Sequence, residues 1–134
     1  MEEMRRGMEE WATEPMPALK RETIDDFFMS ARKCTSLNWK LDIPVKYLMV
    51  SDDDLEPLFP EGEVDRWWRR FYARYPDSSG IINFSHIGFD DQMNQALVVT
   101  GRSCGGLCGA GYFVLLKKDH GLWSVQYKVN TWVS

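Results

Sequence analysis

The stretch Trp123-Ser-Val-Gln-Tyr-Lys-Val-Asn-Thr-Trp-Val133 alternates apolar and polar side chains over most of its length. A period of two is typical of a β-strand that buries one face. The preceding Asp119-His-Gly121 predicts a tight hairpin turn from another strand over 111–118. One face of the last strand should then carry Trp123, Val125, Tyr127, Val129, Thr131 and Val133, and the other Ser124, Gln126, Lys128 and Asn130.

Two further strands are expected before this hairpin. Ile82, Phe84 and His86 alternate with polar neighbours, and residues 95–100 form a second apolar run after a polar turn over 90–94. No crossover helix separates these runs, so neighbouring strands should pair antiparallel. The C-terminal half is therefore predicted to be a four-stranded antiparallel β-meander.

Helical spacing dominates the N-terminal half. Apolar residues at helical spacing predict a helix that begins near Thr23, and a second helix over 63–75 carries Trp67, Trp68 and Phe71 on one stripe. Residues 46–50 are expected to form a short additional strand, and the following Ser51-Asp-Asp-Asp54 resembles a helix N-cap. The predicted fold class is α+β, with N-terminal helices packed on the four-stranded meander.

The chain length suits one domain. Residues 19–134 are predicted to form that single α+β domain. Residues 1–18 are predicted to be an N-terminal appendage, because Met4, Met8 and Trp11 form only a short apolar stripe before Pro15. Such a stripe is too small to form a core alone, which suggests a role in assembly, including a homodimer.

Composition excludes several classes of protein. Hydrophobic residues make up 44% of the chain, which is typical of a packed domain and not of disorder. No apolar run has the length of a membrane-spanning helix, so a soluble protein without membrane contact is expected. The formal charge of −4 argues against nucleic acid as a partner. The first residues lack the apolar core of a leader, which predicts a cytoplasmic protein, or an exported one if a leader has been removed.

The segment Cys104-Gly-Gly-Leu-Cys108 is the most unusual in the chain. It is interpreted as a glycine-rich loop between two strands, and the loop glycines are Gly105, Gly106, Gly109 and Gly111. The favoured hypothesis is a structural cysteine pair in a tight connection, with Cys34 left free. Redox-active, metal-binding and anion-binding alternatives stay open. No metal and no cofactor is expected, because the spacing of zinc modules and phosphate loops is absent.

His86 is the only candidate catalytic residue. It shares its predicted strand face with Ile82 and Phe84, so it could act as a general base on a concave sheet. The alternative is a histidine at the core edge with no catalytic role, which is favoured because no carboxylate partner can be identified. The arginines of the 63–75 helix are interpreted as a solvated face.

From Gly80 to the C-terminus, the chain resembles a group of small, uncharacterised bacterial domains. The matching segments are Ser85-His-Ile-Gly88-Phe89, Gln95-Ala-Leu-Val98, Cys104-Gly-Gly-Leu-Cys108-Gly-Ala-Gly111-Tyr112, Leu115-Leu-Lys-Lys, Gly121-Leu-Trp123-Ser-Val125 and Trp132-Val-Ser134. That group has no established activity, so the resemblance implies no catalytic residue. Similar proteins often carry a leader, which implies that export is an alternative. Helices before a curved sheet that ends in Gly-x-Trp-x-Val are also similar to NTF2-like and cystatin-like architectures.

The sequence thus favours a non-catalytic binding or protein-interaction domain, whose partner is an unidentified protein or small molecule. The alternative is a small pocket enzyme or ligand carrier of NTF2-like architecture that uses His86. The two hypotheses differ in whether the sheet holds an open, polar cavity or is filled by side chains such as Trp67 and Phe71.

Overall fold

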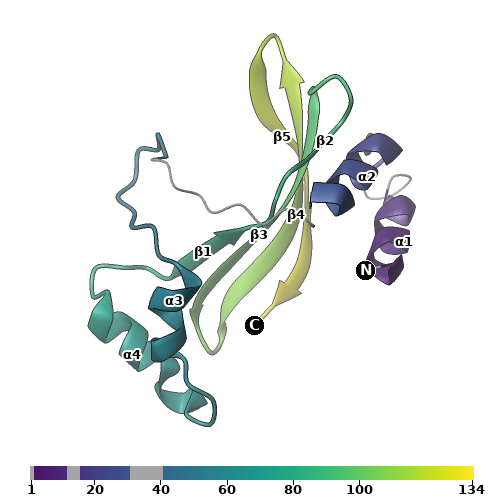
Figure 1. The fold of residues 1–134 in the computed structure, drawn as a ribbon. Helices are drawn as coiled ribbons and strands as arrows, with labels where there is room; N and C mark the ends of the chain where they lie inside the picture. Colours follow the sequence, from purple (N-terminus) through teal and green to yellow (C-terminus); the bar gives the residue numbers. More distant parts are fainter. Residues whose placement is uncertain (1, 12–15, 31–40) are drawn as a thin grey trace.

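The computed structural model describes residues 2–11, 16–30 and 41–134. The described chain contains the helices α1 (Glu2–Trp11), α2 (Arg21–Ser30), α3 (Asp52–Leu55) and α4 (Trp67–Arg74), and the 3₁₀ turns η1 (Glu56–Leu58) and η2 (Val64–Arg66). Its strands are β1 (Ile81–Phe84), β2 (Gly88–Phe89), β3 (Gln95–Gly105), β4 (Cys108–Asp119) and β5 (Leu122–Val133). All strand pairs are antiparallel, which confirms the α+β class (Figure 1).

The sheet has the predicted meander order, with one interruption. Within the described residues its strands lie in the order β1-β3-β4-β5, and β2 pairs with β3 beyond the end of β1. The predicted first strand is therefore split at residues 85–87. The hairpin from β4 to β5 turns through His120 and Gly121, which both have positive φ, as the tight turn predicted from the sequence requires.

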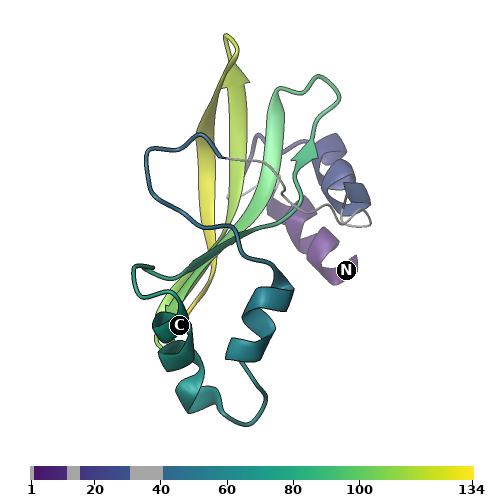
Figure 2. The same ribbon diagram turned by 60° about the vertical axis from the view of Figure 1, so that its left-hand side comes forward.

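Helices α1 and α2 cover one face of this sheet (Figure 2). The core between them consists of buried apolar residues from both layers, namely Met8, Met16, Leu19, Ile24, Phe27, Phe28, Leu97, Phe113 and Leu115. Val99, Tyr127 and Val129 pack against its edge. The face that carries Leu97, Phe113 and Leu115 is called the helix-covered face below, and the opposite one the outer face.

The N-terminal helix takes part in this core. Met8 of α1 is 1% exposed and Met16 is fully buried, whereas Met4 on the same helix is 55% exposed. Residues before position 19 therefore share apolar contacts with the rest of the chain. The boundary between an N-terminal appendage over 1–18 and a domain over 19–134 remains a prediction. Substitution of Met8 tests it by measuring how much α1 contributes to the stability of the domain.

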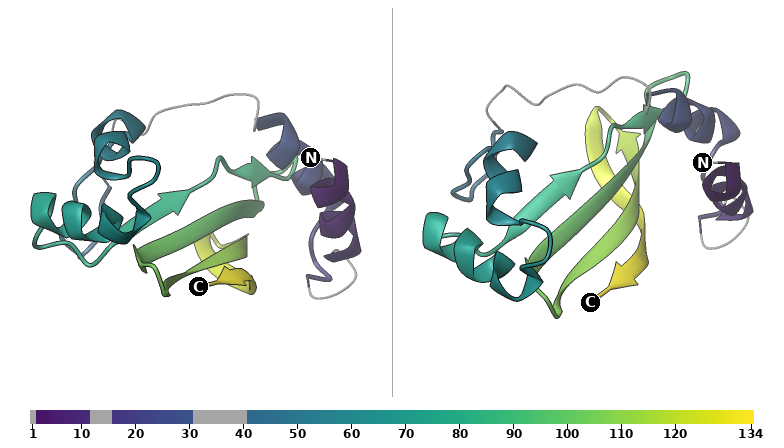
Figure 3. Two further views of the ribbon diagram at one scale, coloured as in Figure 1. Left: turned by 90° about the horizontal axis from the view of Figure 1, so that it is seen from below. Right: turned by 60° about the horizontal axis from the view of Figure 1, so that its bottom comes forward.

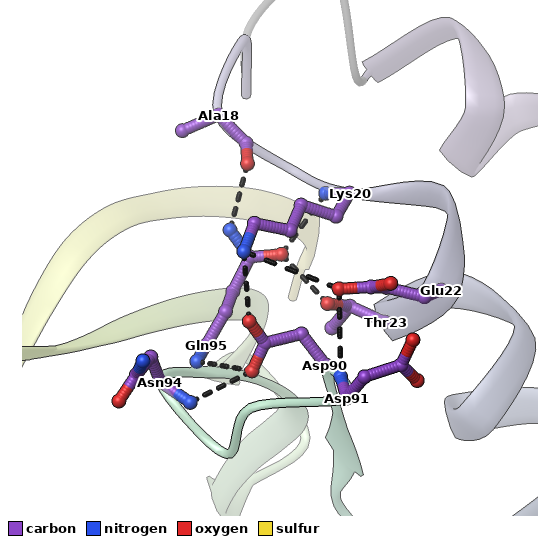
Figure 4. A network of polar contacts seen from close by, with 8 residues as sticks. All are labelled: Ala18, Lys20, Glu22, Thr23, Asp90, Asp91, Asn94 and Gln95. Atoms are coloured by element: carbon purple, nitrogen blue, oxygen red, sulfur yellow. Dashed lines mark hydrogen bonds and ion pairs between the residues drawn. The ribbon is translucent and has the colours of Figure 1, made fainter.

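A polar network joins the start of α2 to the turn before β3 (Figure 4). The buried carboxylate of Asp90 accepts hydrogen bonds from the backbone N–H groups of Asn94 and Gln95 and from Lys20 Nζ at 2.8 Å. The side-chain oxygen of Gln95 accepts from Lys20 N and from the Thr23 hydroxyl. Thr23 thus binds the sheet instead of starting the helix, which begins two residues earlier.

Burial and hydrogen bonding oppose one another at Asp90. Burial alone would raise the pKa of the Asp90 carboxyl, but the Lys20 ammonium and the backbone donors outweigh it and hold that pKa below its ordinary value. The hydrogen bond to Asp90 raises the pKa of Lys20 in turn. Each polar group of the pair has a partner, so the network is a structural clamp.

Helices α3 and α4 lie beside the far end of the sheet, away from α1 and α2 (Figure 3). A separate aromatic cluster lies around α4. Phe71 of α4 is 3% exposed and contacts Phe59, Trp68, Tyr72 and Tyr75. The predicted 63–75 helix begins as the 3₁₀ turn η2 before it becomes α-helical. The hydroxyl of Tyr72 donates to the carbonyl of Cys104 at 2.7 Å and so ties this cluster to β3.

The predicted strand over 46–50 is wrong. Residues 41–50 form neither helix nor strand, and Leu48 is 70% exposed. Tyr47 instead closes a local loop, because its hydroxyl contacts both backbone groups of Leu41. An isolated apolar run needs a neighbouring strand to satisfy its backbone, and this segment pairs with no described strand.

The prediction that six alternating residues of β5, from Trp123 to Val133, share one face is also wrong. The pairing of β4 with β5 shifts twice, so Gln126 and Thr131 are extra residues without a direct partner. Each extra residue reverses the alternation of the strand. Tyr127 and Val129 therefore point to the helix-covered face, while Trp123 and Val125 point to the outer face.

Candidate functional site

The outer face of the sheet is the candidate site. Pairing and alternation place on it Ile82, Phe84, Phe89, Ala96, Val98, Thr100, Arg102, Ala110, Tyr112, Val114, Leu116, Lys118, Trp123, Val125, Lys128, Asn130 and Val133. Side-chain contacts support this assignment to one face. Phe89 packs against Trp123, and the Lys128 ammonium lies 4.0 Å from the Tyr112 ring centre.

This outer face exposes large apolar side chains. On the β1 edge Ile82 is 63% exposed and Phe84 is 58% exposed, and on β5 Val125 is 59% exposed. On the central strands the apolar side chains of this face are less exposed, since Ala96 is 4% and Val114 is 8% exposed, so the exposed apolar surface lies mainly along β1 and β5. Apolar patches of this kind, rimmed by polar groups, are typical of interaction sites.

The charges on the outer face are all positive. Arg102, Lys118 and Lys128 face this side, and none of the strand residues assigned to it is acidic. Arg102 and Lys128 form no salt bridge with any carboxylate in the described ranges. The chain as a whole has a net charge of −4, so this face differs in sign from the rest of the protein.

A shallow depression of about 410 Å³ lies on this face near the β3–β4 turn. It is open to solvent and is lined by Ile82, Thr100, Gly101, Arg102, Cys104, Cys108, Gly109, Ala110, Tyr112 and Lys128. Its polar side chains are two cations and two hydroxyl groups. The depression can therefore accept an anionic group, but it offers no carboxylate or histidine as a base.

Cys104 and Cys108 lie at disulfide distance, with their Cα atoms 5.1 Å apart. This separation falls within the range of about 4.4–6.8 Å that a bridge requires, as the sequence predicted. The pair closes the end of the β3–β4 hairpin around Gly106 and Leu107. Leu107 is 93% exposed at the tip. Cys34 lies outside the described residues.

The interpretation of this region as a glycine-rich loop is wrong. Gly105, Gly109 and Gly111 belong to strands, and only Gly106 lies in the two-residue turn. None of the four has positive φ. Gly111 instead faces the indole of Trp132, which also lies against Gly109 and Gly101. The glycines thus make room for a tryptophan, a long-range requirement that the local sequence does not reveal.

His86 does not share the outer face with Ile82 and Phe84. Because β1 ends at Phe84, the alternation stops there, and the His86 ring packs against Phe27 of α2 with ring centres 4.5 Å apart. Its Nε2 atom is buried and has no hydrogen-bond partner in the described part of the chain. The neighbouring Ser85 hydroxyl serves the backbone of His86 and Val99. His86 therefore lies apart from the depression, and no described side chain forms a hydrogen bond with its Nε2 atom.

Other combinations of reactive side chains do not assemble in the described residues. No group of three or more His, Cys, Asp or Glu side chains lies close enough to hold a metal ion there. Within the same residues, no helix has the length and apolar character needed to span a bilayer. The predicted N-cap is confirmed at Ser51, whose hydroxyl accepts from Asp54 N in a capping box.

These observations define a small α+β domain in which α1 and α2 cover one sheet face, while no described helix packs on the other. No protein-family model matches the chain, and no curated protein or solved structure matches it either. The NTF2-like and cystatin-like comparisons therefore remain expectations about architecture. The sequence analysis did not predict the outer face as a site, because the alternation of side chains in β5 reverses at Gln126 and Thr131 and the sequence does not reveal these reversals.

Proposed function

We propose that this chain is a non-catalytic protein-interaction domain that binds its partner on the outer face of the sheet. The observation that supports this most strongly is the combination on one face of exposed apolar side chains and cations without acidic partners. Ile82, Phe84 and Val125, on the two edge strands, supply exposed apolar contacts of the proposed surface. These exposed side chains contribute little apolar burial to the stability of the monomer. A partner that covers them would bury them and so gain binding free energy.

The edge of β5 also favours a partner on this side of the sheet. Among the described strands, β5 pairs only with β4, so its other edge, over Leu122–Val133, has no strand partner there. Edge strands with few charges are ready templates for another chain. β5 carries Lys128 as its single charged residue. A partner on the outer face could therefore extend onto this edge.

The second candidate function is a small-ligand carrier that uses the depression beside Arg102 and Lys128. Its volume of about 410 Å³ is within the usual size of ligand pockets, which favours this candidate over a pocket enzyme. The enzyme hypothesis that depended on His86 receives less support, because that ring packs on Phe27. The depression is also open, whereas small-molecule sites usually enclose most of their ligand.

The cysteine pair also bears on the cellular compartment of the protein. Cys104 and Cys108 lie at disulfide distance, and such bridges persist mainly in oxidising compartments. We therefore favour an exported protein over a cytoplasmic one. Mass measurement of the protein isolated from its native compartment tests this, because a bridge lowers the mass by about 2 Da.

The test of the function compares two outer-face variants with a control. Ile82→Glu and Val125→Glu place a charge on the surface, whereas Val64→Glu does so at a 61% exposed position of η2 away from the sheet. Immobilised proteins are incubated with native extract, and bound proteins are quantified by mass spectrometry. A partner should be retained by wild type and Val64→Glu and reduced at least tenfold by both face variants. Equal retention by all four proteins, with unchanged melting temperatures, would contradict the proposal.

A further inference from the structure

We propose that the partner presents an acidic, amphipathic segment, with carboxylates that bind beside Arg102 and Lys128 and apolar side chains that cover Phe84 and Val125. This inference rests on the proposed function and specifies the chemistry of the partner.

The charge of the face selects an acidic partner. Three cations lie on it with no acidic strand residue among them, although the whole chain is acidic. Complementary potentials accelerate encounter and exclude partners of the wrong sign. Neutral apolar partners would leave these cations partly desolvated without compensation, which costs free energy.

The positions of the cations match a carboxylate. Arg102 and Lys128 line the same depression as Thr100 and Tyr112. The ammonium of Lys128 lies over the Tyr112 ring, which restricts its position without neutralising it. Arginine presents a planar fork of donors that suits a carboxylate, and hydrogen bonds between charged groups are stronger than neutral ones. Carboxylates of a partner that enter the depression would therefore meet Arg102 and Lys128.

A second copy of the chain fits this face less well. Symmetric face-to-face pairing would bring the Arg102 and Lys128 sets of two protomers towards each other, and like charges in an interface are destabilising. The exposed apolar side chains between the cations also distinguish the surface from a phosphate-binding one, where cations dominate the contacts. An anionic membrane is the remaining competitor, and it is included in the test.

The experiment uses two labelled peptides of twelve residues with identical Leu and Phe positions. One peptide carries Glu at all remaining positions and the other Lys. Fluorescence anisotropy with the full chain should show at least tenfold tighter binding of the Glu peptide. That preference should weaken strongly between 50 and 300 mM salt, because the Debye length falls from about 14 Å to about 6 Å over this range.

Two double variants locate the effect. Arg102→Glu/Lys128→Glu should abolish binding of the Glu peptide, whereas Arg66→Glu/Arg69→Glu changes the net charge equally at exposed positions around α4 and should leave it unchanged. Melting curves of both variants confirm folding. Equal loss in the two double variants would overturn the inference, because general charge would then explain the binding.

The remaining outcomes separate this inference from the proposed function. Equal binding of both peptides would overturn the acidic partner and leave apolar docking intact. If neither peptide binds but capture from extract still depends on Ile82 and Val125, the inference fails and the proposed function stands. Vesicles of phosphatidylserine and phosphatidylcholine form the last arm. Binding to these vesicles that is lost in Arg102→Glu/Lys128→Glu would overturn the inference in favour of a membrane surface.

Discussion

Trp132 of β5 pairs with Gly111 of β4, and its indole occupies the space that a side chain on Gly111 would need. Gly109 and Gly101 border the same indole. The indole of Trp132 thus packs directly on three glycines from the neighbouring strands β3 and β4. This contact explains why the strands around the cysteine pair are rich in glycine.

Gly111→Ala should displace the indole of Trp132. We expect a loss of about 1–3 kcal/mol in the free energy of unfolding, the usual effect of overpacking. Gly106→Ala is the matched control, because no heavy atom lies within 4 Å of a Cβ added there. Denaturant titration measures both variants. The double variant Gly111→Ala/Trp132→Ala should lose less free energy of unfolding than the sum of the two single variants. Strictly additive losses would contradict direct packing of Trp132 on Gly111.

Asp90 should make stability depend on pH at acidic values. Its pKa in the folded state lies below the ordinary value near 3.8, so the unfolded chain takes up the proton first as pH falls. The stabilisation is therefore complete above the unfolded pKa and is lost as pH falls through the folded pKa. Asp90→Asn should flatten this acidic part of the stability curve, whereas exposed Asp91→Asn should not. If wild type and Asp90→Asn showed the same dependence of stability on pH, the Asp90 network would not stabilise the fold.

Met8→Ala should destabilise the domain. Met8 is buried in the core, and truncation of such a residue costs about 2–5 kcal/mol. Met4→Ala on the exposed side of the same helix should change the free energy of unfolding by less than about 0.5 kcal/mol. Chemical denaturation compares the two. An unaffected Met8→Ala protein with an altered molar mass in solution would instead support the N-terminal segment as an assembly element.

Cys104 and Cys108 should be bridged under oxidising conditions, and the bridge should not be required for folding. The closed loop is short, so loss of the bridge should cost about 1–3 kcal/mol. Intact mass with and without reductant, together with thiol alkylation, measures the bond. Melting of a Cys104→Ser/Cys108→Ser variant measures its contribution. Complete unfolding of that variant would contradict a purely supporting role, as would a bridge that includes Cys34.

Local patterns predicted much of this fold and little of its candidate site. Alternation identified the strands, and His120-Gly121 identified the hairpin, because both signals depend on near neighbours. The extra residues Gln126 and Thr131 could not be predicted, because a bulge is set by the fit between whole strands. His86 was assigned to the wrong face for the same reason, since the break at residues 85–87 depends on the packing of Phe27.

The glycines show a second limit of local prediction. Glycine is expected where the backbone needs positive φ, and the sequence interpretation followed that rule. Gly111 instead accommodates Trp132, which lies 21 positions later in the sequence. The outer face was missed because its members come from all five strands, and only the pairing register places Phe84 and Val125 on one side.

Hydroxyl-radical footprinting in native extract tests the central claim, the outer face as a docking surface, most directly. Trp123 on the outer face and Trp132 on the helix-covered side have nearly equal exposure, 40% and 42%, so each serves as the other's control. The account predicts that extract lowers the oxidation rate of Trp123 relative to the purified protein and leaves that of Trp132 unchanged. Equal rates for Trp123 in both preparations, or protection of Trp132 alone, would contradict it.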